Sequence, residues 1–422
     1  MSKHKNLTTL ICGPKSAGKS TTSRLLVNRL LTSGTQSEPK PIALLDLDPG
    51  QPEYGAPGTL SLVRVSRPNL GVPFSHPGIG DDTYTVVGSH AIAAVSPASN
   101  PELYRECAIA LYAKYRSELG ESPLVINTPG WIQGTGLELL TELISHIKPH
   151  EVLYMSEDGP AESVDALRDA TSQQFTTLPS QPSELSVRTA AELRDMQTMS
   201  YFHAQQDDVH SHVTRLRWLD RPLSTMEPIV IPYTGEGSIQ GIICYDYQAP
   251  AELLSDSING MVLALVGVDR PAAFRNLRRD TATGRPYTGH TPEGIPFIAN
   301  PGDVALDPRH SQLLGLVLIR GIDTKSRHLL GLSPVLRQNL DSLNAYKGSI
   351  VLVHGNFGCP NWAYTESLHH AQAKDGGGQT RSTAVKASAS AHVPWVEVLE
   401  GNQSRPVGSR RWRVRRDLGR GQ

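Results

Sequence analysis

The stretch Leu7–Leu31, LTTLICGPKSAGKSTTSRLLVNRLL, decides how the rest of the sequence is interpreted. An apolar run ends at Gly13, where the pattern G-x-x-x-x-G-K-[ST] begins, and apolar residues then recur at helical spacing from Leu25. A strand, a glycine-rich loop and a helix in this order form the context in which the pattern binds phosphate. The alternative is a glycine-rich turn before an ordinary helix. Because both flanking elements are present, we predict a nucleoside triphosphate site.

The residue types of this loop suit a bound triphosphate. Glycines allow the backbone N–H groups to surround a phosphate, and the helix N-terminus adds partial positive charge. Lys19 is expected to reach the β- and γ-phosphates, and the Ser20 hydroxyl is expected to ligate Mg²⁺. The predicted nucleotide-binding residues are Gly13, Pro14, Lys15, Ser16, Ala17, Gly18, Lys19, Ser20 and Thr21.

The second predicted strand ends in two carboxylates. Ile42–Leu45 is a short apolar run typical of a buried parallel strand, and Asp46, Asp48 and Gln51 follow it. Acids at the carboxyl end of a core strand, one helix after a phosphate loop, provide the counter-charge that a nucleotide-bound Mg²⁺ needs. The alternative is a solvated turn, because Asp-Pro-Gly is strong turn chemistry. The nearby phosphate loop favours the functional interpretation.

Strands and helices continue to alternate after a loop-rich insert over Tyr54–Ser99. We predict a helix at about 102–119, a strand over 123–127, a helix at about 136–147 and a strand over 152–155. This alternation predicts an α/β fold, a P-loop NTPase with a doubly wound parallel sheet whose ligands bind at the carboxyl ends of the strands.

The turn Thr128–Trp131 follows one of these strands and is therefore expected at the same sheet edge as the phosphate loop. A tryptophan there can stack on a nucleobase, a contact worth about 1–3 kcal/mol. The position alone favours the alternative, a core tryptophan that covers the end of the sheet.

A second candidate contact lies on a helix further along the chain. The segment Glu157–Pro182 is polar and turn-rich, and Ser183–Phe202 then has the pattern of an amphipathic helix that carries Arg188 and Arg194. An arginine on a helix above a nucleotide stabilises charge on a transferring phosphoryl group. Exposed arginines are also common on helices, so both interpretations stand at this point.

Composition narrows the class of protein. A chain of 422 residues suits two domains, and its net charge of −1 argues neither for nor against a nucleic-acid partner. No apolar run approaches the roughly 20 residues of a membrane span, and no signal peptide opens the chain, so we expect no membrane partner. The cysteines lack metal-ligand spacing, which predicts reduced residues of an intracellular protein. They are Cys12, Cys107, Cys244 and Cys359.

The C-terminal half has a different character, and we divide the chain into a domain over 1–225 and a smaller β-rich domain over 226–422. Residues 371–391 have almost no large apolar side chains and are predicted to form a disordered insert. The tail 401–422 is rich in arginine around Trp412, which favours nucleic-acid binding over a solvated tail. The β-prone runs are Ile229–Ile231, Ile239–Tyr247, Val262–Val268, Leu313–Ile319, Ser349–Val353 and Trp395–Leu399.

Three segments together, GPKSAGKST (13–21), DLDPGQPEYGAPG (46–58) and NTPGWIQGTG (127–136), resemble the polynucleotide 5′-hydroxyl kinase family. The most similar branch is the nucleolar, fungal-like one that acts in ribosomal-RNA processing, and 194–202 and 408–416 resemble it as well. The resemblance covers most of the chain outside its inserts. It implies ATP and Mg²⁺ as cofactors and transfer of the γ-phosphate to the 5′-hydroxyl end of RNA.

The resemblance also implies roles for particular residues. Lys19 and Ser20 would hold ATP and Mg²⁺, and Asp48 would accept the proton of the 5′-hydroxyl, with Asp46 beside it near the metal. The assignment of base and metal partner between the two aspartates stays open. Gln51 would line the acceptor side of the site.

A clasp over about 127–136 and a lid over about 183–203 are two further family features. Thr128, Gly130 and Trp131 match the clasp around the terminal nucleotide, which reverses the interpretation that position alone gave for the tryptophan. Arg194 would be the catalytic arginine of the lid.

The family further implies a nuclear, nucleolar location and an endoribonuclease partner whose cut produces the 5′-hydroxyl end. Its members usually carry a sizeable domain before the phosphate loop, whereas Gly13 lies almost at the start here. We therefore expect this sequence to be a catalytic fragment or a truncated gene product.

Two other classes of function compete with the kinase. A P-loop GTPase or ATPase switch usually carries Asp-x-x-Gly after the relevant strand, whereas this chain has Asn-Thr-Pro-Gly over 127–130 and lacks an [NT]KxD motif for guanine. A nucleotide-binding scaffold without phosphate transfer would not need the intact motifs.

Overall fold

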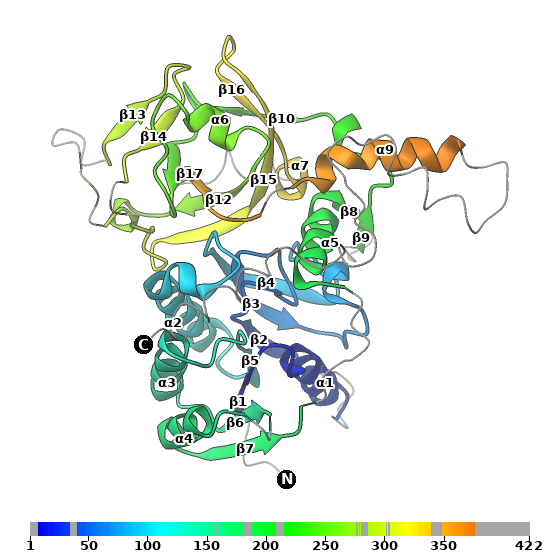
Figure 1. Ribbon diagram of the computed structural model, residues 1–422, viewed down its shortest axis with the longest axis vertical. Coiled ribbons are helices and arrows are strands. Elements are labelled where there is room, and N and C mark those ends of the chain that lie inside the picture. Colours follow the sequence, from blue (N-terminus) through cyan, green and yellow to red (C-terminus); the bar gives the residue numbers. More distant parts are fainter. Residues whose placement is uncertain are drawn as a thin grey trace, which may run out of the picture. The chain divides into compact units, whose positions relative to one another are not determined.

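The computed structural model describes residues 7–33, 40–156, 159–180, 188–207, 215–275, 277, 279, 286–300, 302, 304–338, 348–358 and 360–375. Met1–Ser367 form one compact unit and Leu368–Gln422 a second, and the first contains both large sheets (Figure 1). None of the described helices is long and apolar enough to cross a membrane.

The first sheet has seven strands in the order β4-β3-β2-β5-β1-β6-β7. Its strands are β1 (Thr8–Cys12), β2 (Ile42–Asp46), β3 (Thr59–Val65), β4 (Tyr84–Ala91), β5 (Leu124–Asn127), β6 (Glu151–Met155) and β7 (Gln174–Leu178). The five strands from β2 to β7 in this order are parallel, which confirms the predicted α/β fold. However, β3 and β4 are antiparallel and form one edge. A loop without a helix joins β2 to β3, and such a connection suits an antiparallel pair.

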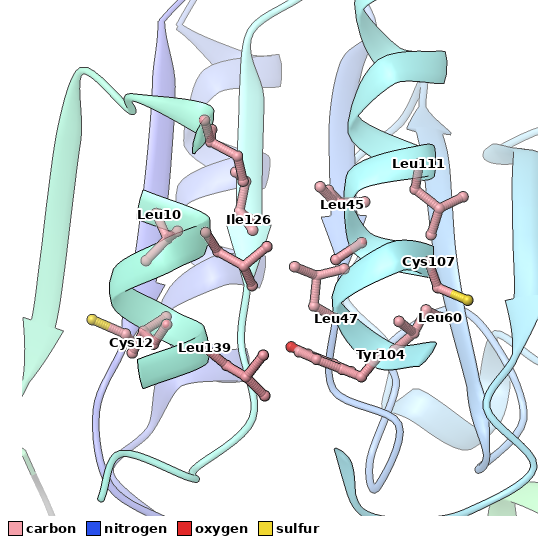
Figure 2. Close-up of a cluster of buried hydrophobic side chains, with 14 of the residues drawn as sticks. Leu10, Cys12, Leu45, Leu47, Leu60, Tyr104, Cys107, Leu111, Ile126 and Leu139 are labelled. Atoms are coloured by element: carbon pink, nitrogen blue, oxygen red, sulfur yellow. The ribbon is translucent and has the colours of Figure 1, made fainter. Parts of the chain in front are cut away.

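Helices cover both faces of this sheet: α1 (Lys19–Thr32), α2 (Pro101–Glu118), α3 (Thr135–Ile147) and α4 (Ala161–Ala170). Neighbouring residues of a strand point to opposite faces, so alternate residues of β1 enter different clusters. Leu10 and Cys12 pack in the cluster that contains α2 and α3, and Figure 2 shows them near Leu139 of α3. Ile11 packs instead in the cluster that contains Val27 of α1. The phosphate loop therefore starts from a strand that is buried on both sides.

The segment predicted to be polar and turn-rich, Glu157–Pro182, contains both α4 and β7, so that prediction is wrong for 161–170 and 174–178. Among the side chains of α4, only Ser163 and Leu167 are buried, and none in the edge strand β7 is fully buried. Such elements carry a weak hydrophobic pattern, because only a small part of each faces the core.

The predicted lid helix corresponds to α5 (Ala190–His203), which is shorter than the predicted 183–202. Thr189 caps it: its hydroxyl accepts the N–H of Glu192, and the Glu192 carboxylate accepts the N–H of Thr189. This reciprocal capping box fixes where the helix begins. Residues 181–187 lie outside the described part of the chain. A two-stranded ribbon of β8 (Ala204–Asp207) and β9 (Arg215–Trp218) follows the helix.

The second sheet has eight strands in the order β10-β16-β15-β12-β17-β11-β14-β13. They are β10 (Ile229–Pro232), β11 (Gly241–Cys244), β12 (Val262–Val268), β13 (Thr288–His290), β14 (Pro296–Ile298), β15 (Ser311–Asp323), β16 (His328–Leu332) and β17 (Ser349–His354). The described helices after α5 are α6 (Leu254–Ile258), α7 (Pro334–Gln338) and α9 (Trp362–Asp375). Short 3₁₀ turns lie at Pro73–Ser75, Pro97–Ser99, Leu223–Thr225 and Pro271–Ala273. The β-rich C-terminal region is thereby confirmed.

The boundary near residue 225 stays a prediction, because the two sheets share buried contacts. Tyr201 and Phe202 of α5 belong to one hydrophobic cluster with residues of β12, β15 and β17. The guanidinium of Arg275 also donates a 2.8 Å hydrogen bond to the Glu106 carboxylate on α2. Residues 371–375 of the predicted disordered insert are helical in α9, which corrects that part of the prediction. The rest of the insert, the run Trp395–Leu399 and the tail 401–422 lie outside the described residues.

Tyr201 provides a test of this shared core. Its side chain is 4% exposed, and its phenol oxygen accepts the Leu316 N–H of β15 at 2.8 Å. We expect Tyr201→Phe to lower the free energy of unfolding by about 1–3 kcal/mol, because a buried N–H loses its acceptor. Urea unfolding measures this change. Tyr247→Phe, at a side chain that is 69% exposed, should change it by less than about 0.5 kcal/mol. Equal effects of the two variants would contradict the prediction.

Candidate active site

The phosphate loop has the backbone conformation that its glycines predict. Gly13, Ser16 and Gly18 have φ values of 141°, 64° and 92°. A Cβ atom on Gly13 would lie 2.6 Å from the Met155 carbonyl oxygen, so only glycine fits between the loop and β6. The loop leads directly into the N-terminus of α1, whose partial positive charge favours an anion.

Lys19 is the first residue of α1, and its side chain turns back over the loop. Its ammonium group donates a 2.8 Å hydrogen bond to the Pro14 carbonyl, and the residue is 6% exposed. Burial lowers the pKa of Lys19, whereas the nearby charge of Asp48 raises it. The lysine therefore lies at the centre of the loop, where the motif requires a cation for phosphate oxygens.

Asp46 and Asn127 end two neighbouring strands. β2 and β5 pair in parallel with Asp46 opposite Asn127, and the Asn127 amide donates to the Asp46 carboxylate at 3.0 Å. The backbone N–H of Glu53 donates to the second carboxylate oxygen at 2.5 Å. Burial raises the pKa of Asp46 to about 7, and these hydrogen bonds lower it only in part. A fully buried carboxylate at this edge needs a cation or a proton to balance its charge.

Ser20, Asp46 and Asn127 together suit a magnesium ion. The Ser20 hydroxyl oxygen lies 3.5 Å from the Asn127 amide nitrogen, and the buried Asn127 Oδ1 has no hydrogen-bond partner. Hydroxyl, carboxylate and amide oxygens are hard donors of the kind that Mg²⁺ binds. The described residues contain no group of three His, Cys, Asp or Glu that could hold a metal. Mg²⁺ does not need one, because it is usually held by one or two carboxylates together with phosphate oxygens and water.

Asp48 lies two residues further along and is half-buried. Its carboxylate accepts the N–H groups of Gly50 at 2.9 Å and of Gln51 at 3.3 Å. Burial raises the pKa of Asp48, and the charges of Lys19 and Arg194 lower it. The structure thus brings the three predicted catalytic residues, Lys19, Asp48 and Arg194, within electrostatic range of one another. Their catalytic roles, like the part given to Gln51, stay predictions.

The turn Thr128–Trp131 contacts the phosphate loop. A Cβ atom on Gly130 would lie 2.7 Å from the backbone N and Cα of Lys15, so the two backbones pass each other closely. The buried Thr128 hydroxyl donates to the Ile11 carbonyl at 2.9 Å and ties the turn to β1. Its hydroxyl therefore positions the turn, and the predicted contact of this side chain with RNA stays untested.

Trp131 combines features of both interpretations that the sequence allowed. The residue is half-buried against the main hydrophobic cluster, and its ring covers Gly136 at the start of α3. A Cβ atom on Gly136 would lie 2.5 Å from the Trp131 Cγ. Packing thus fixes the indole beside the phosphate loop while part of it stays in contact with solvent. A role in stacking on a base stays a prediction.

Several residues of the site escaped the sequence interpretation. Asn127 was recognised as a strand end and as part of the predicted clasp 127–136, but not as a metal ligand, although its position at the carboxyl end of a strand could have indicated one. Arg24 of α1 donates two 2.9 Å hydrogen bonds to Glu53, and Gln197 of α5 donates to the Gly55 carbonyl at 2.8 Å. Neither contact has a sequence signature, because each joins segments that only the folded chain brings together.

Comparison with known proteins now adds to this geometry. Residues 13–204 match the family model described as "mRNA cleavage and polyadenylation factor CLP1 P-loop". The polynucleotide 5′-hydroxyl-kinase GRC3 of Gibberella zeae is 50% identical over 99% of this chain and 61% of its own length. This chain is similar in sequence to these fungal polynucleotide 5′-hydroxyl-kinases. The kinase grc3 of Aspergillus niger is 36% identical over 94% of this chain and 57% of its own length. The chain thus spans about three-fifths of the length of these two relatives.

A solved structure has a fold similar to that of this chain. The chain matches the structure titled "Structure of wild-type Clp1p-Pcf11p (454 -563) complex" with a TM-score of 0.53 and 18% identity. The match covers 84% of this chain and 75% of that one. At this identity the likeness concerns the fold alone. The resemblance and the fold class inferred from the sequence are both confirmed, and a P-loop family implies use of a nucleotide.

The raised pKa of Asp46 predicts how stability depends on pH. Burial raises the pKa of Asp46 in the folded state to about 7, whereas the ordinary pKa of this carboxyl is 3.8. The stabilising effect of this proton is present below pH 3.8 and is lost as pH rises toward 7. Relative to Asp46→Asn, the wild type should lose a few kcal/mol of unfolding free energy across this range, since one pKa unit equals about 1.4 kcal/mol.

Urea unfolding in EDTA at a series of pH values measures this difference. The Asn variant keeps the size of the side chain and cannot titrate. A difference between the two proteins that stays constant from pH 4 to 8 would show that Asp46 is ionised throughout.

Proposed function

We propose that this protein is an ATP-dependent polynucleotide 5′-hydroxyl kinase that transfers the γ-phosphate of ATP to the 5′-hydroxyl end of RNA. The observation that carries the proposal is the position of Asp48, a carboxylate within electrostatic range of both Lys19 of the phosphate loop and Arg194 of α5. Homology to the fungal kinases supports it independently.

Each catalytic side chain would have a distinct task. Asp48 would accept the proton of the RNA 5′-hydroxyl while the hydroxyl oxygen bonds to the γ-phosphorus. The bond between the γ-phosphorus and the bridging oxygen would break, and ADP would leave. Lys19 and Arg194 would neutralise the charge that spreads over the phosphoryl oxygens, which is the main contribution of a protein to this reaction.

The neighbouring polar residues would hold the nucleotide and the metal. Ser20, Asp46 and Asn127 would hold Mg²⁺, which would supply charge neutralisation for the phosphates. The backbone N–H groups of 13 and 15–21 would bind the phosphates, since Pro14 has none. The raised pKa of Asp46 agrees with a buried carboxylate to which no cation is bound. Between the two acids, Asp46 accepts the hydrogen bond of the Asn127 amide at 3.0 Å, which favours Asp46 as the metal partner and leaves Asp48 as the base.

The biological setting is proposed from the family resemblance. We propose that the RNA is a ribosomal-RNA precursor in the nucleolus and that an endoribonuclease partner makes the 5′-hydroxyl end. A fluorescent fusion of the protein would test the location, and purification of the tagged protein would test the partner. A cytoplasmic signal and the absence of an associated nuclease would overturn these two points without affecting the kinase reaction.

Two substitutions test the transfer itself. The purified protein is incubated with γ-labelled ATP and a 5′-hydroxyl RNA oligonucleotide, and label on the RNA is measured. Lys19→Ala and Asp48→Asn should each reduce transfer at least about a hundredfold, because they remove a charge-neutralising cation and a general base. Lys325→Ala and Asp169→Asn, at exposed positions far along the chain, serve as matched controls and should transfer normally.

The same assay separates the competing functions. A wild-type protein that binds nucleotide but transfers no label would be a switch or a scaffold. Full activity of Asp48→Asn would remove this residue as the base.

Trp131 provides a test of the RNA contact. Trp131→Leu keeps an apolar side chain over Gly136 but removes the aromatic face. We expect the KM for the oligonucleotide to rise at least about fivefold, from the loss of about 1 kcal/mol or more of stacking, with the KM for ATP unchanged. Trp131→Phe should retain most of the affinity. If both variants bind RNA like the wild type, the indole has only a packing role.

A further inference from the structure

The lid helix α5 is attached to the loop that carries the two acids through one buried side chain. Gln197 is 3% exposed, and its amide nitrogen donates to the carbonyls of Pro52 and, at 2.8 Å, Gly55. An amide nitrogen has two N–H groups, so each carbonyl accepts one of them. Both acceptors lie in the turn that follows Asp48 and Gln51.

The same turn is held from two other sides. Between the two carbonyls lies Glu53, whose N–H donates to Asp46 and whose carboxylate forms a two-pronged ion pair with Arg24 of α1. Asn69 donates a further 2.9 Å hydrogen bond to this carboxylate. The turn 52–55 therefore forms hydrogen bonds with three elements: α1 through Arg24, β2 through Asp46 and the lid helix α5 through Gln197.

Gln197 is also the first firm attachment of the helix. From Ala190 to Met196 no side chain of α5 is buried, and Gln197 is the first that is. Arg194 lies three residues earlier, on the same side of the helix and about 4.5 Å along its axis. The hydrogen bonds of Gln197 thus fix the helix one turn away from the arginine.

We propose that Gln197 is a positioning residue that anchors the N-terminal half of the lid helix on the turn 52–55 and so holds Arg194 beside Asp48. This inference rests on the proposed kinase function for its catalytic consequence, and its structural part is independent of that function. Because the turn also binds Asp46 and Arg24, the anchor fixes the position of Arg194 relative to Asp46, Asp48 and the phosphate loop.

Gln197→Met tests the anchor. Methionine has a similar length and no charge, but it donates no hydrogen bond to the two carbonyls. Gln206→Met is the matched control, because Gln206 of β8 also donates to two carbonyls, those of Ile79 and Gly80, which do not belong to the turn 52–55. Hydrogen exchange of the backbone amides at 192–196 should become about tenfold faster in Gln197→Met and stay unchanged in the control.

Transfer of label to RNA tests the consequence for Arg194. We expect Gln197→Met to lower kcat about 10- to 100-fold, the range usual for residues that orient a catalytic group, with little change in the KM for ATP. If Gln197 acts through Arg194, the double variant with Arg194→Ala should be no slower than Arg194→Ala alone. Rate losses that multiply in the double variant would overturn the inference, and so would equal behaviour of Gln197→Met and Gln206→Met.

The two measurements also separate this inference from the proposed function. If the wild type transfers no phosphate, the kinase proposal fails, while hydrogen exchange still decides whether Gln197 anchors the helix. If the wild type is active and exchange at 192–196 is the same in both variants, the kinase proposal stands and the anchor is excluded.

Discussion

The candidate active site depends on the register of three parallel strands. β5 lies between β1 and β2, and Asn127 is opposite Ile11 on one side and Asp46 on the other. The phosphate loop after β1, the loop after β2 that carries Asp48 and the turn after β5 therefore all begin at the same edge of the sheet. A slip of one residue would turn every side chain of a strand to the other face of the sheet and would separate Asp46 from Asn127. Apolar packing on both faces makes such a slip costly, so the core of the sheet also determines the geometry of the site.

The site concentrates charge where water has been removed. Asp46 is fully buried, Lys19 is nearly so, and Glu53 is buried behind them with Arg24 as its partner. A buried carboxylate is unfavourable unless donors or cations compensate it. Backbone N–H groups, an amide and a guanidinium supply part of this compensation. The raised pKa of Asp46 and the unpartnered oxygen of Asn127 show that this compensation is incomplete at the position where we propose that Mg²⁺ binds.

Much of this arrangement could be predicted from the sequence. The strand, loop and helix over 7–31 follow from a local pattern, and Asp46 and Asp48 could be placed because carboxyl ends of parallel strands meet at one edge. The antiparallel pair β3 and β4 was missed because the period of an apolar run does not reveal the direction of a strand. The inward hydrogen bond of Thr128 and the contacts of Glu53 and Gln197 were missed for another reason. They depend on how loops fold over the sheet, for which the residue types give no signal.

The helix that carries Arg194 also has consequences for how the protein is made. Its C-terminal residues Tyr201 and Phe202 share a buried cluster with residues of the second sheet, and the hydrogen-bond partner of Tyr201 lies 115 residues further along the chain. At a synthesis rate of about 5–20 residues per second, this partner leaves the ribosome roughly 6 to 23 seconds after the tyrosine does. During this interval two large aromatic side chains lack their apolar partners in the second sheet. The nucleotide-binding sheet can therefore form early in synthesis, whereas the helix above it acquires its final place only when the second sheet closes.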